Sequence, residues 1–221
     1  MAWRQQCNSL SGIKTTQVGH CERGSFFSQY DLKVDVTKLT LFTEDFYDKL
    51  ASVTPTAKVP TLVDGEVTVW DSLAILEYVN EQYLQGKAWP SHVADKAKAR
   101  AISAEMHSGF FDLRNELPMN CRARRKVELS DGALKDIARI DAIWSEQMAK
   151  FPDAFLFGEW SIADAMYAPV ALRFETYGIE LSQGAKAYQQ KVLASQAVQK
   201  WLAEASQETD IVEEDEAGVE V

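Results

Sequence analysis

The residues with the clearest chemical potential in this sequence stand in two short segments, Lys58-Val59-Pro60 and Asp71-Ser72. Asp71 or Ser72 can cap a helix that begins there, and the free N–H groups of a helix start also attract a carboxylate. An acidic side chain at the same place can meet an ammonium group, and Lys58 can pair with a second carboxylate. The alternative is structural, with Asp71 and Ser72 as caps, Pro60 as the start of an edge strand and Lys58 as a solvated loop cation.

Thiol and imidazole chemistry has less support. The chain has three cysteines and three histidines: Cys7, Cys21, Cys121, His20, His92 and His107. The cysteines form no C-x-x-C pair, which is typical of a reducing compartment and predicts a cytoplasmic location. The histidines have no metal-ligand spacing, so we expect neither a disulfide framework nor a metal. Residues 1–21 contain no Asp or Glu, which leaves an organelle transit peptide open as an alternative.

Charge and hydropathy exclude several classes of partner. The 221-residue chain has a formal net charge of −10, which argues against a general affinity for nucleic acid or an anionic membrane. No apolar run approaches the roughly 20 residues that a membrane-spanning helix needs. Part of the negative charge lies in Glu213-Glu214-Asp215-Glu216, and this pattern predicts a solvated, disordered tail over 209–221.

A hairpin and a helix would position the two segments. Two β-branched runs flank Asp64-Gly65, the dipeptide preferred in a type I′ turn, which predicts a hairpin over 59–70. The helix that follows has an apolar stripe formed by Leu73, Leu76, Val79 and Tyr83. Upstream, alternation predicts a strand within 32–42, and residues 46–50 are typical of a short helix. Residues 3–11 are largely polar and give no convincing first strand.

From about Ala94 the pattern is one of long helices. The first has a stripe that runs from Ile102 to Leu117 and ends at Pro118. The others are expected at 134–151, from Ser161, where Ser161 and Asp164 form a capping pattern, and over 184–205. These elements predict an α/β N-terminal domain over 1–82, a linker over 83–91 and an all-helical domain over 92–208.

The sequence resembles the cytosolic glutathione transferase family, in its bacterial-type or zeta-like branch. The resemblance is carried by three segments: 57–65 (AKVPTLVDG), 70–75 (WDSLAI) and 161–165 (SIADA). Their order and spacing match the family over roughly 34–202. Membership implies a thioredoxin-like N-terminal domain, an all-helical C-terminal domain, glutathione as co-substrate and a homodimer.

The resemblance also assigns roles to residues. Pro60 would follow a cis peptide bond, and the backbone of Val59 would hold the cysteinyl part of glutathione. Asp71 and Ser72 would bind the γ-glutamyl end, and Lys58 the glycine carboxylate. Ser161 and Asp164 would be structural.

The sequence departs from the family where the catalytic hydroxyl or thiol should stand, in 15–23. No serine lies there, and Cys21 could serve as an omega-like nucleophile or be an incidental buried thiol. Thr15 or Thr16 could instead donate a hydrogen bond to the thiolate. If the alignment shifts, the further candidates are Ser9, Ser11, Ser25 and Ser28.

A second-substrate site is expected between the domains. Its candidates are Met106, Phe110 and Arg114, with Met119, Phe174 and Tyr177 from later segments. Three functions remain open: transfer of glutathione to a small electrophile, glutathione-dependent cis–trans isomerisation of an unsaturated diacid, and a glutathione-binding or interaction module that has lost its chemistry.

Overall fold

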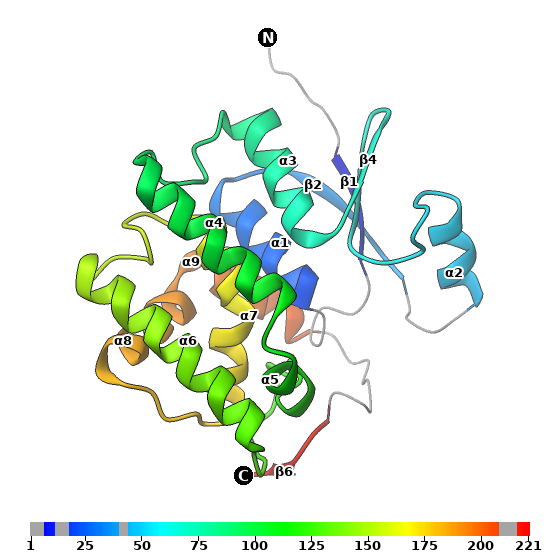
Figure 1. Ribbon diagram of the computed structural model, residues 1–221. Helices are drawn as coiled ribbons and strands as arrows, with labels where there is room; N and C mark the ends of the chain where they lie inside the picture. Colours follow the sequence, from blue (N-terminus) through cyan, green and yellow to red (C-terminus); the bar gives the residue numbers. More distant parts are fainter. Residues whose placement is uncertain (1–6, 12–17, 40–43, 208–215) are drawn as a thin grey trace.

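The computed structural model describes residues 7–11, 18–39, 44–207 and 216–221, and it forms two packed domains (Figure 1). The N-terminal domain contains β1 (Cys7–Ser11), α1 (Val18–Gln29), β2 (Val34–Lys38), α2 (Glu44–Ala51), β3 (Thr61–Asp64), β4 (Val67–Trp70) and α3 (Ser72–Leu84). The sheet order is β2-β1-β3-β4, with β1 parallel to β2 and antiparallel to β3. Helices α1 and α3 lie between the sheet and the helical domain, and α2 lies on the other side of the sheet (Figure 1). This is a thioredoxin-like arrangement.

The first strand is present although its sequence gives no convincing strand pattern. Strand β1 pairs over its whole length with β2, and Asn8 to Leu10 also pair with β3. A strand with partners on both sides gains two ladders of backbone hydrogen bonds, which depend little on side-chain hydropathy. The missing hydrophobic alternation therefore did not prevent a central strand.

The hairpin between β3 and β4 forms in the predicted place with a different turn. Its pairs run from Thr61 with Trp70 to Asp64 with Val67, so the central turn residues are Gly65 and Glu66. Gly65 has φ 61°, whereas Glu66 is not among the residues with positive φ. A single positive φ at the first central residue excludes type I′ and matches type II′. Asp64 belongs to the strand.

The C-terminal domain is built around one buried helix. It contains α4 (Val93–Ser108), α5 (Phe111–Glu116), α6 (Asp131–Lys150), α7 (Ile162–Thr176), α8 (Gln183–Ala194) and α9 (Gln196–Ala205). Nearly every residue of α7 is buried, and this helix packs against α1, α4 and α8. Because α1 also contacts α9, a single hydrophobic core crosses from one domain into the other.

Two of the predicted long helices are broken. The helix expected to run through Leu117 divides into α4 and α5, because Gly109 is extended and Phe110 has φ 57°. The helix expected over 184–205 divides into α8 and α9 at Ser195, whose hydroxyl accepts the N–H of Val198 at 3.4 Å as an N-cap. In both cases the apolar periodicity continues across the break, so the pattern alone did not mark it.

The predicted capping box at the start of α7 is present. One oxygen of Asp164 accepts the N–H and the hydroxyl of Ser161, at 2.8 and 2.9 Å. The other accepts the N–H of Leu156 at 3.1 Å and the hydroxyl of Tyr188 at 3.0 Å. Burial raises the pKa of Asp164 to about 6, although all four hydrogen bonds oppose the shift. These contacts give Asp164 a structural role.

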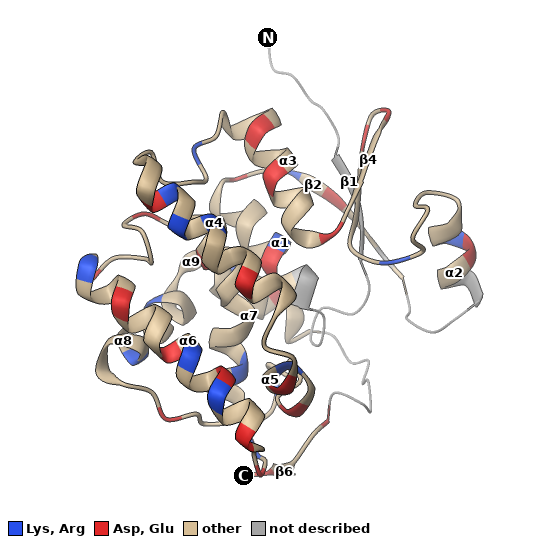
Figure 2. Ribbon diagram, viewed as in Figure 1, with Lys and Arg blue, Asp and Glu red and all other residues tan. Residues whose placement is uncertain are grey.

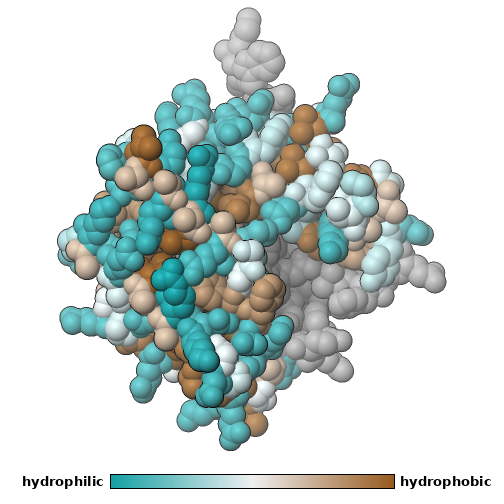
Figure 3. Space-filling model, viewed as in Figure 1, coloured by the Kyte–Doolittle hydropathy of each residue, from teal (hydrophilic) through white to brown (hydrophobic). Residues whose placement is uncertain are grey.

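The surface of the helical domain carries interspersed charges. Acidic and basic residues follow one another along α4 and α6 (Figure 2), and two ion pairs, Lys98 with Glu146 and Arg139 with Glu105, join these helices. The face in view is mostly hydrophilic, with hydrophobic residues in small separate patches (Figure 3). None of the described helices is both long and apolar enough to span a bilayer.

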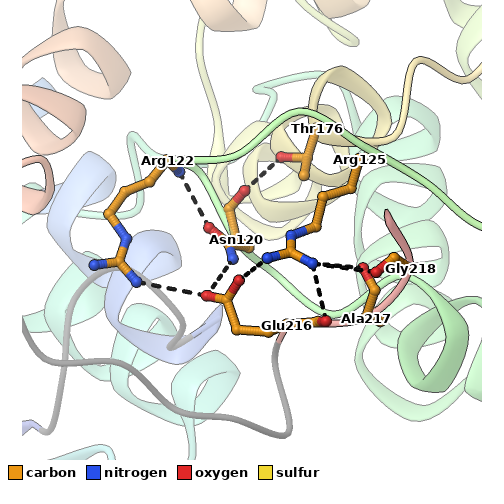
Figure 4. Close-up of polar contacts among 7 residues, drawn as sticks. All are labelled: Asn120, Arg122, Arg125, Thr176, Glu216, Ala217 and Gly218. Atoms are coloured by element: carbon orange, nitrogen blue, oxygen red, sulfur yellow. Dashed lines mark hydrogen bonds and ion pairs between the residues drawn. The ribbon is translucent and has the colours of Figure 1, made fainter. Parts of the chain in front are cut away.

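Of the tail over 209–221 that the sequence predicts to be disordered, residues 209–215 lie outside the described residues, and residues 216–221 contact the helical domain. Strand β6 (Val219–Glu220) pairs with β5 (Arg125–Lys126), and Glu216 lies among Asn120, Arg122 and Arg125 (Figure 4). The Asn120 amide donates to the Glu216 carboxylate at 2.8 Å, and the Arg125 guanidinium donates to the same carboxylate and to the Glu216 carbonyl. The acidic composition therefore did not reveal that residues 216–221 are held to a basic segment of the same chain by charge pairing.

Candidate functional site

A cavity of about 480 Å³ lies between the two domains. Its lining is Glu22, Thr56, Lys58, Val59, Pro60, Trp70, Asp71, Ser72, His107 and Arg114. These residues come from α1, the connection before β3, the end of β4, the start of α3, the end of α4 and α5. The five residues that the sequence assigns to glutathione, although they stand in two separate segments, all line this one cavity.

The loop before β3 brings the Lys58 segment to the cavity. The Val59–Pro60 peptide bond is cis, as the family resemblance implies. The Thr61 hydroxyl donates to the Lys58 carbonyl at 2.9 Å and closes the turn around this bond. The Lys58 side chain is exposed at the rim, where the structure gives it no ion-pair partner among the described residues.

Asp71 has both of the roles that its position suggests. It is the N-cap of α3, with φ 78°, and its Oδ1 accepts the N–H of Ala74 at 3.1 Å. Its Oδ2 lies 2.7 Å from Nε2 of His107, at the C-terminal end of α4. One carboxylate thus caps a helix of the first domain and contacts the second domain. Sequence reasoning gave His107 no role, because no local pattern pairs it with a residue 36 positions earlier.

Glu22 is a second residue of the cavity that sequence reasoning missed. Only 2% of its surface is exposed, and it lines the cavity together with Ser72. Burial raises the pKa of Glu22 to about 7 and nearby Asp71 adds to the shift, whereas the Ser72 hydroxyl and the charge of Arg114 oppose it. A signal was available in the sequence, since Glu22 and Arg23 are adjacent charges in a helix that must bury one face.

Arg23 is buried beside Glu22. Burial lowers its pKa to about 10, and the charge of Glu22 opposes that shift. The Arg23 side chain is 1% exposed and is not among the residues that line the cavity. Arg23 therefore influences the cavity through its electrostatic interaction with Glu22.

Arg114 joins α5 to the end of α4. Its Nε donates to the Gly109 carbonyl at 3.0 Å, and its terminal nitrogen donates to the carbonyls of Met106 and His107. The guanidinium therefore satisfies carbonyl groups that the helix end leaves without intrahelical partners. Of the candidates for the second-substrate site, Arg114 lines the cavity.

The other candidates for the second-substrate site lie in the core. Their exposed fractions are 1% for Met106, 8% for Phe110, 1% for Met119, 1% for Phe174 and 5% for Tyr177. In this structure these side chains support the helical domain and do not line the cavity. Apolar residues at helical spacing were more informative about the core than about a ligand.

The structure gives Cys21 the surroundings of a core residue. Its side chain is completely buried, and it belongs to the main hydrophobic cluster together with Phe26 and Trp201. Burial raises the pKa of the Cys21 thiol well above its usual range, and nearby Cys121 and Glu22 add to the shift. A nucleophilic cysteine needs the opposite shift and access to substrate. The geometry therefore favours the alternative of an incidental buried thiol.

The remaining candidates for thiol activation divide into two groups. Thr15 and Thr16 lie outside the described residues, and Ser9 and Ser11 belong to β1, whose side chains are also outside them. The two other serines lie in α1: the Ser25 hydroxyl is buried and donates to the Cys21 carbonyl at 2.8 Å, and Ser28 faces a groove with Val34 and Trp201. Neither Ser25 nor Ser28 lines the cavity.

Comparison with known proteins gives the cavity a context. Residues 27–81 match the family described as the glutathione S-transferase N-terminal domain, and residues 121–204 match the glutathione S-transferase C-terminal domain. A solved glutathione transferase homologue from Burkholderia, with bound glutathione, superposes with a TM-score of 0.71 at 20% identity. The alignment covers 92% of this chain and 100% of that one. The fold and the two matched domains define the class of cytosolic glutathione transferases.

The chain belongs to this family. Among curated proteins, it is 21% identical to a stringent starvation protein A homologue of Histophilus somni over 154 residues, or 68% of this chain and 70% of the relative. It is 42% identical to a probable maleylacetoacetate isomerase of Caenorhabditis elegans over 76 residues, or 34% of this chain and 35% of the relative. The likeness to the zeta-like branch is thus restricted to part of the chain.

Proposed function

We propose that the protein binds glutathione in the cavity between its domains and transfers the glutathione thiolate to a small electrophile. The observation that supports this proposal most strongly is the convergence of Lys58, Val59, Pro60, Asp71 and Ser72 on one cavity. The cavity provides positively charged and N–H groups for the two carboxylates of this tripeptide and a carboxylate for its one ammonium group.

Each part of glutathione has a proposed partner. The backbone of Val59 holds the cysteinyl unit, and Lys58 pairs with the glycine carboxylate. The first N–H groups of α3 and the Ser72 hydroxyl hold the γ-glutamyl carboxylate. The Asp71 carboxylate, at the same helix start, holds the ammonium group. Arg114 lines the same cavity, and its positive charge favours an acceptor with a negative charge.

Catalysis in this proposal is a matter of orientation and of thiol ionisation. A bound thiolate held in a fixed position attacks an electrophilic carbon, the leaving group departs with the bonding electrons, and glutathione becomes a thioether. We further propose that the protein is cytoplasmic and forms a homodimer, as the family resemblance implies. Sedimentation of the purified chain would test the homodimer.

A glutathione-binding module without transferase activity is the second candidate. Two observations favour it: Cys21 is buried in the core, and the relative from Histophilus somni is not named as an enzyme. A glutathione-dependent isomerase is the third, and it is favoured by the partial match to the probable maleylacetoacetate isomerase.

One set of measurements separates these candidates. Retention on immobilised glutathione tests binding, the ultraviolet absorbance of the bound thiol tests its ionisation, and the loss of free thiol with a chloronitrobenzene acceptor tests transfer. Binding with a lowered thiol pKa and conjugation above the uncatalysed rate supports the transferase. Binding with an unshifted thiol leaves the module, and conversion of a cis diacid without loss of glutathione indicates the isomerase. Absence of binding would overturn all three.

A further inference from the structure

A basic surface of the helical domain has no role in the function proposed above. Residues 120–126, which lie between α5 and α6, include three arginines and one lysine in a chain whose net charge is −10. We call these residues the basic segment. None of them lines the cavity between the domains, and residues 216–221 of the same chain lie against them (Figure 4).

The Glu216 carboxylate is the centre of this contact. It accepts hydrogen bonds from the Asn120 amide at 2.8 Å and from the Arg125 guanidinium, and it lies 3.7 Å from the guanidinium of Arg122. Three donors from one short segment thus converge on a single carboxylate (Figure 4). The basic segment therefore has the geometry of an anion-binding site, and the anion that fills it is a glutamate of the same chain.

The other contacts are made to the main chain of residues 216–221. Nη1 of Arg125 donates to the carbonyl groups of residues 216, 217 and 218, at 3.0, 3.5 and 3.3 Å. Strand β6 pairs with β5, and the N–H of Val221 donates to the Arg124 carbonyl at 3.0 Å. A nucleic acid has no backbone N–H groups with which to pair in this way, so the surface is suited to an extended peptide.

Gly218 adds a requirement on the sequence of that peptide. Its φ is 78°, in the left-handed region, and a Cβ atom at this position would overlap the carbonyl oxygen of Lys126. The side chains of Val219 and Val221, by contrast, are 68% and 71% exposed, so the surface does not select them. The surface therefore recognises an extended chain in which a glycine follows two positions after a glutamate.

The two sides of the contact are held differently. The basic segment is fixed to α7 by contacts that do not involve 216–221: the Asn120 carbonyl accepts the Thr176 hydroxyl at 2.6 Å, and Arg124 pairs with Glu175 at 3.1 Å. Residues 216–221 have no buried apolar side chain. Their ionic contacts lie at a partly exposed surface, where salt weakens them. An occupant held in this way can be exchanged for another of the same chemistry.

We propose that the basic segment is a docking site for an acidic, extended segment of a partner protein, and that residues 216–221 occupy it as an intramolecular competitor. The partner provides a glutamate carboxylate to Asn120 and Arg125 and a glycine beside Lys126, and it pairs with β5 in place of β6. A tethered segment competes at an effective concentration on the order of millimolar. Docking is therefore selective for partners that bind more tightly than the chain's own segment.

The test is the fluorescence anisotropy of a labelled peptide with the sequence of residues 216–221 (EAGVEV), blocked at both ends and added to the full chain. In Gly218→Val the chain's own segment is displaced, because the new side chain overlaps the Lys126 carbonyl, whereas the basic segment is unchanged. We expect this variant to bind the peptide about tenfold more tightly than the wild type does. Its affinity should fall severalfold between about 0.05 M and about 0.3 M salt. Val219→Thr, an exposed change in the same strand, should behave like the wild type.

Two peptide variants and one further protein variant locate the contact. Peptides with Glu216→Gln or Gly218→Val should bind the Gly218→Val chain about tenfold more weakly, and Arg125→Gln added to that chain should abolish binding. A second measurement uses isotope-labelled wild type, in which saturating peptide should speed the amide hydrogen exchange of Val221 by releasing it from Arg124. This measurement keeps the test decisive if Gly218→Val does not fold.

The outcomes that contradict the proposal are distinct. Equal affinities of the wild type and Gly218→Val for the peptide would overturn it, as would undiminished binding of the peptides that lack the glutamate or the glycine. A Gly218→Val chain that binds no peptide would also overturn it. If that chain in addition sediments differently from the wild type, residues 216–221 belong to an interface between two copies of the protein.

Discussion

The Asp71 carboxylate lies 2.7 Å from Nε2 of His107, and this contact joins the start of α3 to the end of α4. Both side chains are partly exposed, at 40% and 35%. In the proposed site the ligand ammonium approaches the same carboxylate, so it must share Asp71 with His107 or displace it. The contact makes ligand binding and domain contact compete for one oxygen atom.

Replacement of His107 should therefore strengthen glutathione binding. His107→Asn removes a group that is positively charged when protonated, and solvent screening at this exposed pair keeps the expected gain to about twofold to fivefold, or roughly 0.5–1 kcal/mol. Isothermal titration calorimetry of the wild type and His107→Asn in the same buffer measures it. An affinity that falls in a folded variant would mean that His107 itself holds the ligand.

Asp71 should contribute to binding through its charge as well as its cap. Asp71→Asn leaves a side-chain oxygen that can accept the N–H of Ala74, which preserves the N-cap while the charge is lost. If Asp71 meets the ligand ammonium, the variant should bind glutathione about 1–3 kcal/mol more weakly at nearly unchanged thermal stability. Asp71→Ala, which also loses the cap, should in addition unfold at a lower temperature. Equal affinities of Asp71→Asn and wild type would reduce Asp71 to a cap.

Sequence reasoning succeeded where a local pattern determines local structure. The cap at Asp71 and the capping box at Ser161 depend on residues within four positions of one another, and the cis bond at Pro60 followed from the family resemblance. It failed where distant segments meet. The contact of His107 with Asp71 and the pairing of Glu216 with Arg125 become visible only when the fold brings α4 to α3 and the end of the chain to β5.

Cys21 offers a direct test of the nucleophile prediction. Because its thiol is fully buried and burial raises its pKa, we expect Cys21→Ala to keep glutathione binding and any conjugation activity. The loss of a buried sulfur should lower the free energy of unfolding by about 1–2 kcal/mol, since it leaves a small cavity. Activity assays and chemical denaturation of one preparation separate the two effects. A folded Cys21→Ala variant that binds glutathione but has lost conjugation would restore Cys21 as the nucleophile.

Glu216 should stabilise the connection between α5 and α6. Its carboxylate receives Asn120 and Arg125, and the Asn120 carbonyl accepts the hydroxyl of Thr176 from α7 at 2.6 Å (Figure 4). Glu216→Gln weakens the charge-assisted hydrogen bond from Arg125. We therefore expect the free energy of unfolding to fall by about 1–3 kcal/mol and amide hydrogen exchange in 120–126 to become faster.

Glu220→Gln is the matched control for this change. Glu220 lies in the same terminal segment, is exposed, and pairs with Arg125 through the backbone register of β5 and β6. The Glu220→Gln variant loses the same charge but keeps the contacts of Glu216, so amide hydrogen exchange in 120–126 should remain as in the wild type. If the two variants are indistinguishable, the Glu216 contacts add nothing to the stability of this connection.

Glu22 should make the folded state less stable as the pH rises. Its pKa is raised from 4.5 to about 7 on folding, so the folded protein binds this proton more tightly than the unfolded chain does. The stability linked to that proton is complete below about pH 4.5 and is lost as the pH rises towards about 7, by an amount on the order of 3 kcal/mol. Asp164 acts in the same direction over a lower pH range, since burial raises its pKa from 3.8 to about 6.

Glu22→Gln removes the part of this pH dependence that Glu22 causes and leaves the part that Asp164 causes. Urea denaturation from about pH 5 to about pH 8 should therefore give a flatter profile for Glu22→Gln, chiefly between about pH 6 and about pH 7, where the Asp164 contribution has ended. Parallel profiles of the two proteins above pH 6 would show that Glu22 is already ionised in the folded state.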